Sequence, residues 1–358
     1  MAGACPLVAA VARSMLLSRM PVKRSEVPPR VMQVFPAILL GKKLWRRFFK
    51  HPWLGVQQAL EKRRYHQLWD RQLAAADANA WIHQQLQAGQ PLLVARIGHT
   101  EGRIVGEWLF QRGRYGRLTR KEAHQYSGIF PVNQQLLSDF AQVYAAAVQQ
   151  ADLLGFWQTT HQARLLSKWQ PDISLAPLSA LEPYLHPCPW SAALEGRRVL
   201  VVHPFAQSIL RQYTTNRKRL FPNPAVLPDF ELQVLAPPQT LAPSTAGFAT
   251  WLEALDDLVG RVLEREFDLA LLGCGAYGLP LGAAIKQSGR QAIHLGGALQ
   301  VMFGIRGRRW EEIPGVAALM NDHWIRPSRQ DKTRLPPILV LKSPITVCIC
   351  TESALIAG

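Results

Sequence analysis

The sequence predicts an α/β fold of the Rossmann-like type, with a mostly parallel sheet and helices on both of its faces. Two observations carry this prediction. Short apolar runs alternate with segments of helical periodicity along most of the 358 residues, which is typical of sheets built from βαβ units. One apolar run also leads into a G-x-G-x-x-G fingerprint and then a helical pattern, as the first turn of such a unit does.

The first half of the chain is predicted to be mainly helical. Residues 55–90 combine helix formers with helical spacing and stop at a glycine. The elements expected next are a short buried strand at 91–98, a helix from 99 to 113 and one long Ala/Gln/Leu-rich helix at 120–150. A proline-rich stretch at 171–190 then divides this helical part, 55–190, from a nucleotide-binding-like part, 191–328.

The second half alternates strands and helices more regularly. Expected elements are a strand at 197–205 with a helix after it, a strand at 230–239 closed by prolines, an amphipathic helix at 244–267, and a strand–helix–strand unit at 268–297. Ser244 is a candidate N-cap for the amphipathic helix. Residues 329–358 are apolar and form a divergent tail.

Positive charge is concentrated near the N-terminus. Residues 1–64 contain 13 Lys and Arg against 2 Asp and Glu, while the whole chain has a formal charge of +16. We therefore expect a helical basic N-terminal extension at 1–54 that is partly disordered or associates with a membrane. Its stretch 31–55 has an apolar run of about eleven residues, too short for a span of about 20, followed by Lys, Arg, Trp and Phe. Two interpretations stand equally: an arm that binds an anionic membrane surface, or a solvated basic arm.

Cysteine usage and the start of the chain favour a cytoplasmic protein, peripheral on the membrane if the arm binds lipid. The five cysteines show no paired spacing, so we expect neither a disulfide framework nor a zinc site. The first residues lack the early positive charge of a secretory signal. The body of the chain has little net charge and no nucleic-acid-binding module, so no nucleic acid partner is expected.

The glycine fingerprint consists of Gly273, Gly275 and Gly278. Such glycines permit a tight turn and bring backbone amides at a helix start close to an anion, so a phosphate-bearing ligand is expected. A dinucleotide site also needs an acidic residue about 20 residues further on. No Asp or Glu occurs between Asp268 and Trp310, so NAD is not expected. The alternative is that these glycines only let the helix pack on the sheet.

Residues 269–310, followed by N-D-H-W-I-R-P-S at 321–328, resemble a group of bacterial proteins found with polysaccharide-assembly genes. This group is similar to the GT-D type glycosyltransferases. Their R-x-G-D-G-E motif corresponds here to Arg96, Gly98 and Glu101, while His99 and Thr100 depart from it. In the family the two carboxylates hold Mn²⁺ or Mg²⁺. The resemblance therefore implies Glu101, with His99, as a possible metal site, and oxygen ligands suit these ions best.

The resemblance implies a transferase that moves a sugar from a nucleotide-diphosphate donor to a glycan or lipid-linked acceptor in surface polysaccharide synthesis. Such chemistry needs charge compensation for the diphosphate and a base for the acceptor hydroxyl. The candidate catalytic residues are Glu101, Asp229 and His203. The candidate substrate-binding residues are Arg96, Gly98, Gly273, Gly275, Tyr277, Gly278, His294, Gly296, Arg306, Arg309, Asn321, His323, Trp324 and Arg326. Tyr277 is expected to stack on the base or sugar, and Cys274 to be a small buried filler.

Two other interpretations stay open. A non-catalytic sugar-nucleotide-binding protein would explain the loss of the family's Asp at position 99. An NAD(P)-dependent oxidoreductase would explain the glycine fingerprint, but it would leave the missing ribose carboxylate unexplained.

Overall fold

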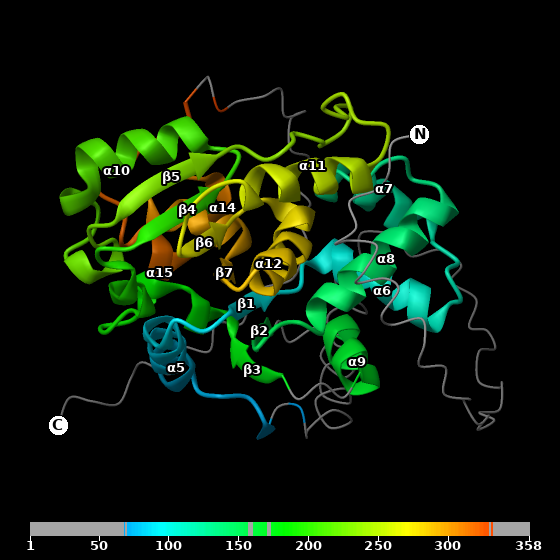
Figure 1. Cartoon of the computed structure of the whole chain (residues 1–358), viewed down its shortest axis with the longest axis horizontal. Coiled ribbons are helices and arrows are strands. Elements are labelled where there is room, and N and C mark those ends of the chain that lie inside the picture. The colour runs from blue at the N-terminus through cyan, green and yellow to red at the C-terminus, as the bar shows by residue number, and fades with distance from the viewer. Residues whose placement is uncertain (1–67, 69, 157–159, 170–172, 329–330, 332–358) are drawn as a thin grey trace, which may run out of the picture.

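The chain folds around one seven-stranded sheet in which all strands are parallel (Figure 1). The computed structural model describes residues 68, 70–156, 160–169, 173–328 and 331. Helices cover both faces of the sheet, so the predicted Rossmann-like α/β class is confirmed. Expectations about residues 1–54, including the membrane-binding stretch 31–55, lie outside the described residues.

The strand order across the sheet is β3-β2-β1-β7-β6-β4-β5. The strands are β1 (Leu92–Arg96), β2 (Leu153–Phe156), β3 (Ser174–Pro177), β4 (Arg198–Val202), β5 (Glu231–Leu235), β6 (Leu269–Leu272) and β7 (Gln291–His294). Strands β1 to β3 come from the part predicted at 55–190, and β4 to β7 from the part at 191–328. The two parts join where β1 pairs with β7, Val94 opposite Ile293.

Each central strand is buried on both faces because successive side chains point to opposite sides. In β1, Leu93 and Ala95 belong to one hydrophobic core, and Leu92 and Val94 to the other. The first core contains α6 (His99–Phe110), α7 (Arg117–Ser127), α8 (Gln134–Val148), α9 (Thr160–Trp169), α11 (Trp251–Leu263) and α12 (Gly278–Gln287). The second contains α5 (Ala75–Ala88), α10 (Ala206–Leu220), α13 (Leu299–Met302), α14 (Arg308–Glu311) and α15 (Pro314–Ala317).

The long helix expected at 120–150 is wrong, because two helices, α7 and α8, occupy this range. Gly128 ends α7 with a left-handed φ of 64°, a conformation that glycine adopts easily. Pro131 follows in the connection, and Asn133 starts α8 by accepting a hydrogen bond from the Leu136 amide at 2.8 Å. Strands β2 and β3, each of only four residues, were not predicted from the sequence.

The N-cap expected at Ser244 is wrong as well. Helix α11 begins seven residues later, at Trp251, and its cap is Thr250, whose hydroxyl accepts a hydrogen bond from the Glu253 amide at 3.2 Å. Glu253 in turn accepts a hydrogen bond from the Ala249 amide at 3.0 Å. Thr and Glu three residues apart are a signature of helix starts, so the signal was present but was placed too early in the chain. No described helix is both long and apolar enough to pass through a membrane.

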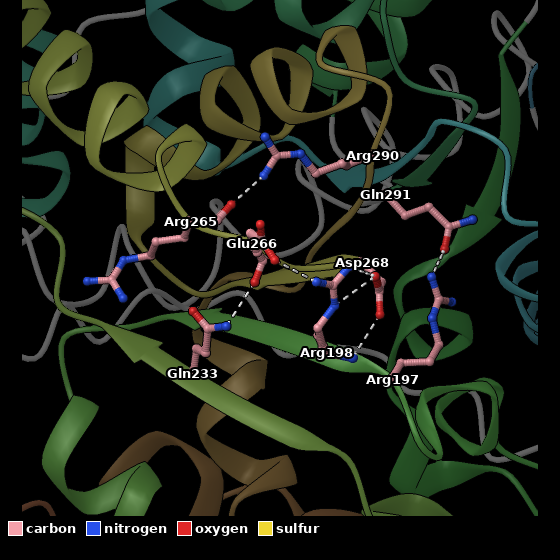
Figure 2. A network of polar contacts seen from close by, with 8 residues as sticks. All are labelled: Arg197, Arg198, Gln233, Arg265, Glu266, Asp268, Arg290 and Gln291. Atoms are coloured by element: carbon pink, nitrogen blue, oxygen red, sulfur yellow. Dashed lines mark hydrogen bonds and ion pairs between the residues drawn. The ribbon is translucent and has the colours of Figure 1, made fainter.

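The amino ends of the central strands are tied together by a polar network (Figure 2). Arg198, at the start of β4, contacts Asp268, just before β6, at 2.7 Å and Glu266 at 3.0 Å. Arg197 donates a hydrogen bond to Gln291, the first residue of β7, at 2.7 Å. These contacts fix the ends of β4, β6 and β7 relative to one another at the edge opposite the candidate site.

We expect Asp268→Asn to destabilise the chain slightly at neutral pH. Hydrogen bonds from Arg198 hold the pKa of Asp268 below its ordinary value. A carboxyl whose pKa falls on folding stabilises the native state above its unfolded pKa, about 3.9, and this contribution disappears as the pH falls through the folded pKa. The urea midpoint of the variant should therefore lie below that of the wild type at pH 7 and converge with it in acid. The effect is small because the pair is partly exposed.

Candidate functional site

The candidate site lies at the edge where the parallel strands have their carboxyl ends, the usual ligand-binding edge of such sheets. Arg96 ends β1, and His294 ends the adjacent strand β7. Loops leaving β6 and β4 add Gly273 and His203. Strands β4 and β6 are neighbours, and their connections run in opposite lateral directions along the strand order: β4 leads outward to β5, whereas β6 leads inward to β7. The order therefore has a switch point between these two strands.

Two arginines flank the glycine turn that follows β7. The Arg96 guanidinium donates a hydrogen bond to the Leu295 carbonyl at 3.2 Å, and a Cβ at Gly296 would lie 3.5 Å from Arg96 Cδ. Arg309, from α14, approaches the next residue so closely that a Cβ at Gly297 would lie 2.5 Å from its Nη2. Gly297 itself is exposed, so backbone that a ligand can reach lies between two cationic groups.

Both arginines interact with Glu182, a residue that the sequence analysis missed. Glu182 lies between two short 3-10 turns, η1 (Leu178–Leu181) and η2 (Pro183–Leu185), beyond the carboxyl end of β3. Burial raises its pKa, while Arg96 and Arg309 partly offset this rise. The neighbouring Tyr184 hydroxyl is buried beside Glu182; burial raises its pKa, and the charge of Glu182 and a hydrogen bond to Glu182 raise it further.

The exposure of Arg309 and the environment of its charge differ. The residue as a whole is exposed, yet desolvation lowers the pKa of its guanidinium, and Arg96 is lowered in the same way, mainly by burial and further by Arg309. The desolvation acts on the guanidinium, because this group lies close against Gly297. This arrangement presents a partly desolvated cationic pair at the strand ends, where an anion would be bound more strongly than in water.

Glu101 is buried in the first turn of α6 and folds back over Gly98, where any Cβ would overlap its carboxylate. Tyr144 accepts a hydrogen bond from the Gly98 amide at 3.2 Å. Burial raises the pKa of Glu101, and its own amide, the Ser127 hydroxyl and Arg96 partly offset the rise. The three residues that match the motif therefore lie close together, with the buried Glu101 carboxyl next to Gly98 and near Arg96.

The expected metal pair of Glu101 and His99 does not fit this geometry. Residues two apart on a helix point in nearly opposite directions. His99 is exposed and accepts a hydrogen bond from Arg103 at 2.8 Å, and burial and then Arg103 lower its pKa. Among the described residues, no three His, Cys, Asp or Glu side chains come together in a way that could hold a metal ion. We therefore assign no chemical step to a metal.

We expect Glu101→Gln to stabilise the fold at neutral and alkaline pH. Because folding raises this pKa, the wild type loses stability as the pH climbs from about 4.3, the unfolded value, through the higher folded value. Glutamine keeps the shape without the buried charge. Urea denaturation at several pH values should show the variant's advantage growing with pH. A variant less stable than the wild type at every pH would instead make Glu101 a stabilising structural acid.

The glycine fingerprint packs against two buried histidines. A Cβ at Gly273 would overlap the His203 ring, and a Cβ at Gly278 would overlap the His294 ring. Burial lowers the pKa of each histidine to about 3, with Arg96 adding to the effect at His294. Both rings are therefore neutral near pH 7. His203 Nδ1 accepts a hydrogen bond from the Phe205 amide at 2.9 Å, which fixes the tautomer with the proton on Nε2.

The remaining positions of this loop have different roles. Gly275 is exposed with a left-handed φ of 61°, and a methyl group added there would meet no atom within 4 Å, so among the three glycines it alone leaves backbone open to a ligand. The expected stacking of Tyr277 on a ligand is wrong, because Tyr277 is buried against Trp251, ring centroids 4.9 Å apart, and hydrogen-bonds Thr240 at 2.8 Å. Cys274 is the predicted buried filler, and burial raises its pKa to about 12.

The N-D-H-W-I-R-P-S cluster lies elsewhere. Asn321 and Trp324 donate hydrogen bonds to the Leu220 carbonyl, at the end of α10 near the amino edge of the sheet. Two other candidates have partners in the same cluster: Arg306 donates to the Asn321 carbonyl, and the His323 carbonyl accepts from Gln212. Arg326 instead pairs with Glu311 on α14, the short helix that also carries Arg309. Asn321 and Trp324 therefore lie away from the strand ends at which Arg96 lies.

Asp229 is also at the amino edge, just before β5, where it pairs with Arg217 at 3.1 Å. It therefore cannot serve as a base beside the Arg96 and Arg309 pair. At the carboxyl edge, Asp331 accepts hydrogen bonds from the Gln207 and Ser208 amides at 3.0 and 3.1 Å. This carboxylate, from the stretch predicted as a divergent tail, fills the amino end of α10 next to His203.

Sequence patterns offered one usable signal for the missed acid. Glu182 stands in A-L-E-P-Y-L, an apolar context in which a carboxylate needs a charged partner if it is buried. Nothing in the spacing identified Tyr144, which comes from the middle of α8. Comparison of the chain with protein-family models, with curated proteins and with solved structures finds no match.

Proposed function

We propose that the chain is a glycosyltransferase that moves a sugar from a nucleotide-diphosphate donor to a glycan or lipid-linked acceptor. The observation that carries this proposal is the pair of guanidinium groups, Arg96 and Arg309, on either side of the turn formed by Gly296 and the exposed Gly297. A diphosphate leaving group needs such compensation, and arginine can donate two hydrogen bonds to one phosphate. The motif resemblance at Arg96, Gly98 and Glu101 supports the same assignment.

In this mechanism the two arginines bind the diphosphate, whose bond to the sugar breaks as the acceptor oxygen forms its new bond. The proton of the acceptor hydroxyl must go to a base. Glu182 suits this role better than Asp229, because it lies beside both arginines and its raised pKa makes it a stronger base near neutral pH. The buried Glu101 positions Arg96. The neutral His203 and His294 support the loop from beneath.

A dinucleotide oxidoreductase is the second candidate, favoured by the glycine fingerprint alone. Two of its three glycines are explained by the buried histidines. Strand β7, which follows the fingerprint, ends at His294 and not at a carboxylate that could bind a ribose. These features favour the transferase. Work on a lipid-linked acceptor would place the protein peripherally at the cytoplasmic face of a membrane.

Thermal unfolding of the full chain with UDP-, GDP-, dTDP- and CMP-sugars and with NAD(P)(H), each with and without Mn²⁺, tests this function. A ligand at a hundredfold excess over its Kd stabilises the native state by about 2.7 kcal/mol, which is readily measured. We expect stabilisation by one class of sugar nucleotide, followed by transfer of its labelled sugar to a membrane glycan fraction. Stabilisation by NAD(P)(H) alone, or by none of the panel, would overturn the proposal.

A further inference from the structure

An exposed basic ridge runs through the α6–α7 connection and along α7. We define this ridge as Arg112, Arg114, Arg117, Leu118, Arg120, Lys121 and Tyr126; Arg120 is half-buried and donates a hydrogen bond to the Tyr115 carbonyl at 3.2 Å, and the other six are exposed. Leu118 is 59% exposed, the highest value among the exposed large hydrophobic side chains of the described chain, and Tyr126 is 38% exposed. On the helix, Lys121 neighbours both Arg117, four residues before it, and Leu118, three residues before it, so an exposed apolar side chain lies next to a pair of cations.

The acidic residues of this region turn away from the ridge. Glu107 on α6 accepts hydrogen bonds from the Gly116 amide at 2.9 Å and from the Thr119 hydroxyl at 2.6 Å. Glu122 is buried and pairs with Arg103 at 2.6 Å. Within the described part of the chain, the five cations of the ridge make no ion pair with a carboxylate. The ridge therefore presents its positive charge to solvent.

Local structure does not favour cations in these positions. Arg117 and Arg120 lie in the first turn of α7, where the helix dipole favours acidic side chains. Arg112 has a left-handed φ of 55°, a conformation common for glycine and costly for a long side chain. Neither placement helps the fold, and an exposed leucine gains nothing from water. These side chains therefore contribute little to the stability of the fold.

We propose that the basic ridge is a docking surface for an anionic lipid bilayer, independent of the reaction that the strand-end site performs. Arginine and lysine at the headgroup level attract acidic lipids, and a leucine and a tyrosine between them suit the boundary with the acyl chains. A nucleic acid would match the charge but would gain little from an exposed aliphatic side chain, since single strands stack on aromatic rings. The combination therefore favours lipid.

The position of the ridge fits a role at a membrane. The last residue of α7, Ser127, lies beside Glu101 at the carboxyl edge of the sheet. Figure 1 shows α7 at the end of the molecule toward which the strands point. A bilayer docked on the ridge would therefore lie at the same end of the molecule as the candidate site.

Flotation of the full chain with vesicles tests the ridge. The vesicles are phosphatidylcholine alone and phosphatidylcholine with phosphatidylglycerol. We compare the wild type with Arg117→Glu/Lys121→Glu and with a matched control, Arg211→Glu/Lys218→Glu, which reverses two exposed charges on α10. The ridge variant should still fold, because both side chains are exposed and Arg117→Glu places an acid in the first turn of α7; thermal unfolding checks this.

We expect binding to acidic vesicles only, a loss of at least about thirtyfold in partitioning for the ridge variant, and little change for the α10 control. Hydrogen exchange of the wild type should also show protection of residues 111–127 on acidic vesicles, which separates the ridge from any binding by other segments. Equal partitioning of the two variants, or no protection at 111–127, would overturn the proposal. Loss of oligonucleotide binding in the ridge variant, with vesicle binding unchanged, would make nucleic acid the partner.

Discussion

Gly278→Ala should lower the free energy of unfolding by about 3 kcal/mol, the upper end of the range for overpacking a core. Gly278 begins α12, where alanine would ordinarily stabilise a helix by up to about 1 kcal/mol. Here the added methyl would overlap the ring of His294, and both residues are buried. The ring is confined at the end of β7, so the clash outweighs the gain in helix propensity. Urea denaturation measures the difference.

Two variants separate this explanation from a general sensitivity of the loop. Gly275→Ala, in the same fingerprint, meets no atom within 4 Å and costs only what its φ of 61° imposes, about 1 kcal/mol. The double variant Gly278→Ala/His294→Ala removes the ring that the methyl would meet. We expect its destabilisation to be well below the sum of the two single changes, which is the signature of direct contact. Additive effects would show that the clash is absent.

The glycine fingerprint shows what sequence spacing can and cannot specify. Its position after β6 and before α12 was predicted correctly, because apolar runs and helical periodicity determine where a strand gives way to a helix. The role of the fingerprint was not predicted, because the spacing of glycines does not show which side chains pack against them. Gly278 accommodates His294, which is sixteen residues further along the chain. That contact exists only once β7 has paired with β6.

Some residues of the candidate site could likewise be predicted from the sequence, and others could not. Residues at strand ends, such as Arg96 and His294, were predictable because all carboxyl ends of a parallel sheet share one edge. Asp229 and Trp324 were misplaced because a loop can lie at either edge, and only the direction of the next element decides which. Glu182 was missed because the proline-rich stretch around it was interpreted as a divider. In the fold, that stretch carries β3 and brings a carboxylate back to β1.

Arg309→Ala should weaken donor binding by about thirty- to a hundredfold, the loss expected for a charge-assisted hydrogen bond to phosphate. Arg309 is exposed and packs on Trp310, its cation 4.3 Å from the ring centroid, so its removal should leave the fold nearly as stable as before. The adjacent Arg308 provides a matched control. It lies on the same short helix and is exposed. Arg308→Ala removes the same charge and should change binding less than about threefold.

The comparison distinguishes a positioned guanidinium from long-range attraction. If the net positive charge of this loop alone attracted the donor, both variants would weaken binding equally, and added salt would bring the wild type and both variants to the same affinity. If Arg309 contacts the diphosphate beside Gly297, only the Arg309→Ala variant loses affinity. Arg309→Lys should regain only part of this affinity, because lysine keeps the positive charge but lacks the planar fork of arginine. Titration of each variant with the sugar nucleotide identified by thermal unfolding, at low and high salt, gives the answer. Equal affinity of Arg309→Ala and Arg308→Ala would remove Arg309 from the site and, with it, the main support for the transferase.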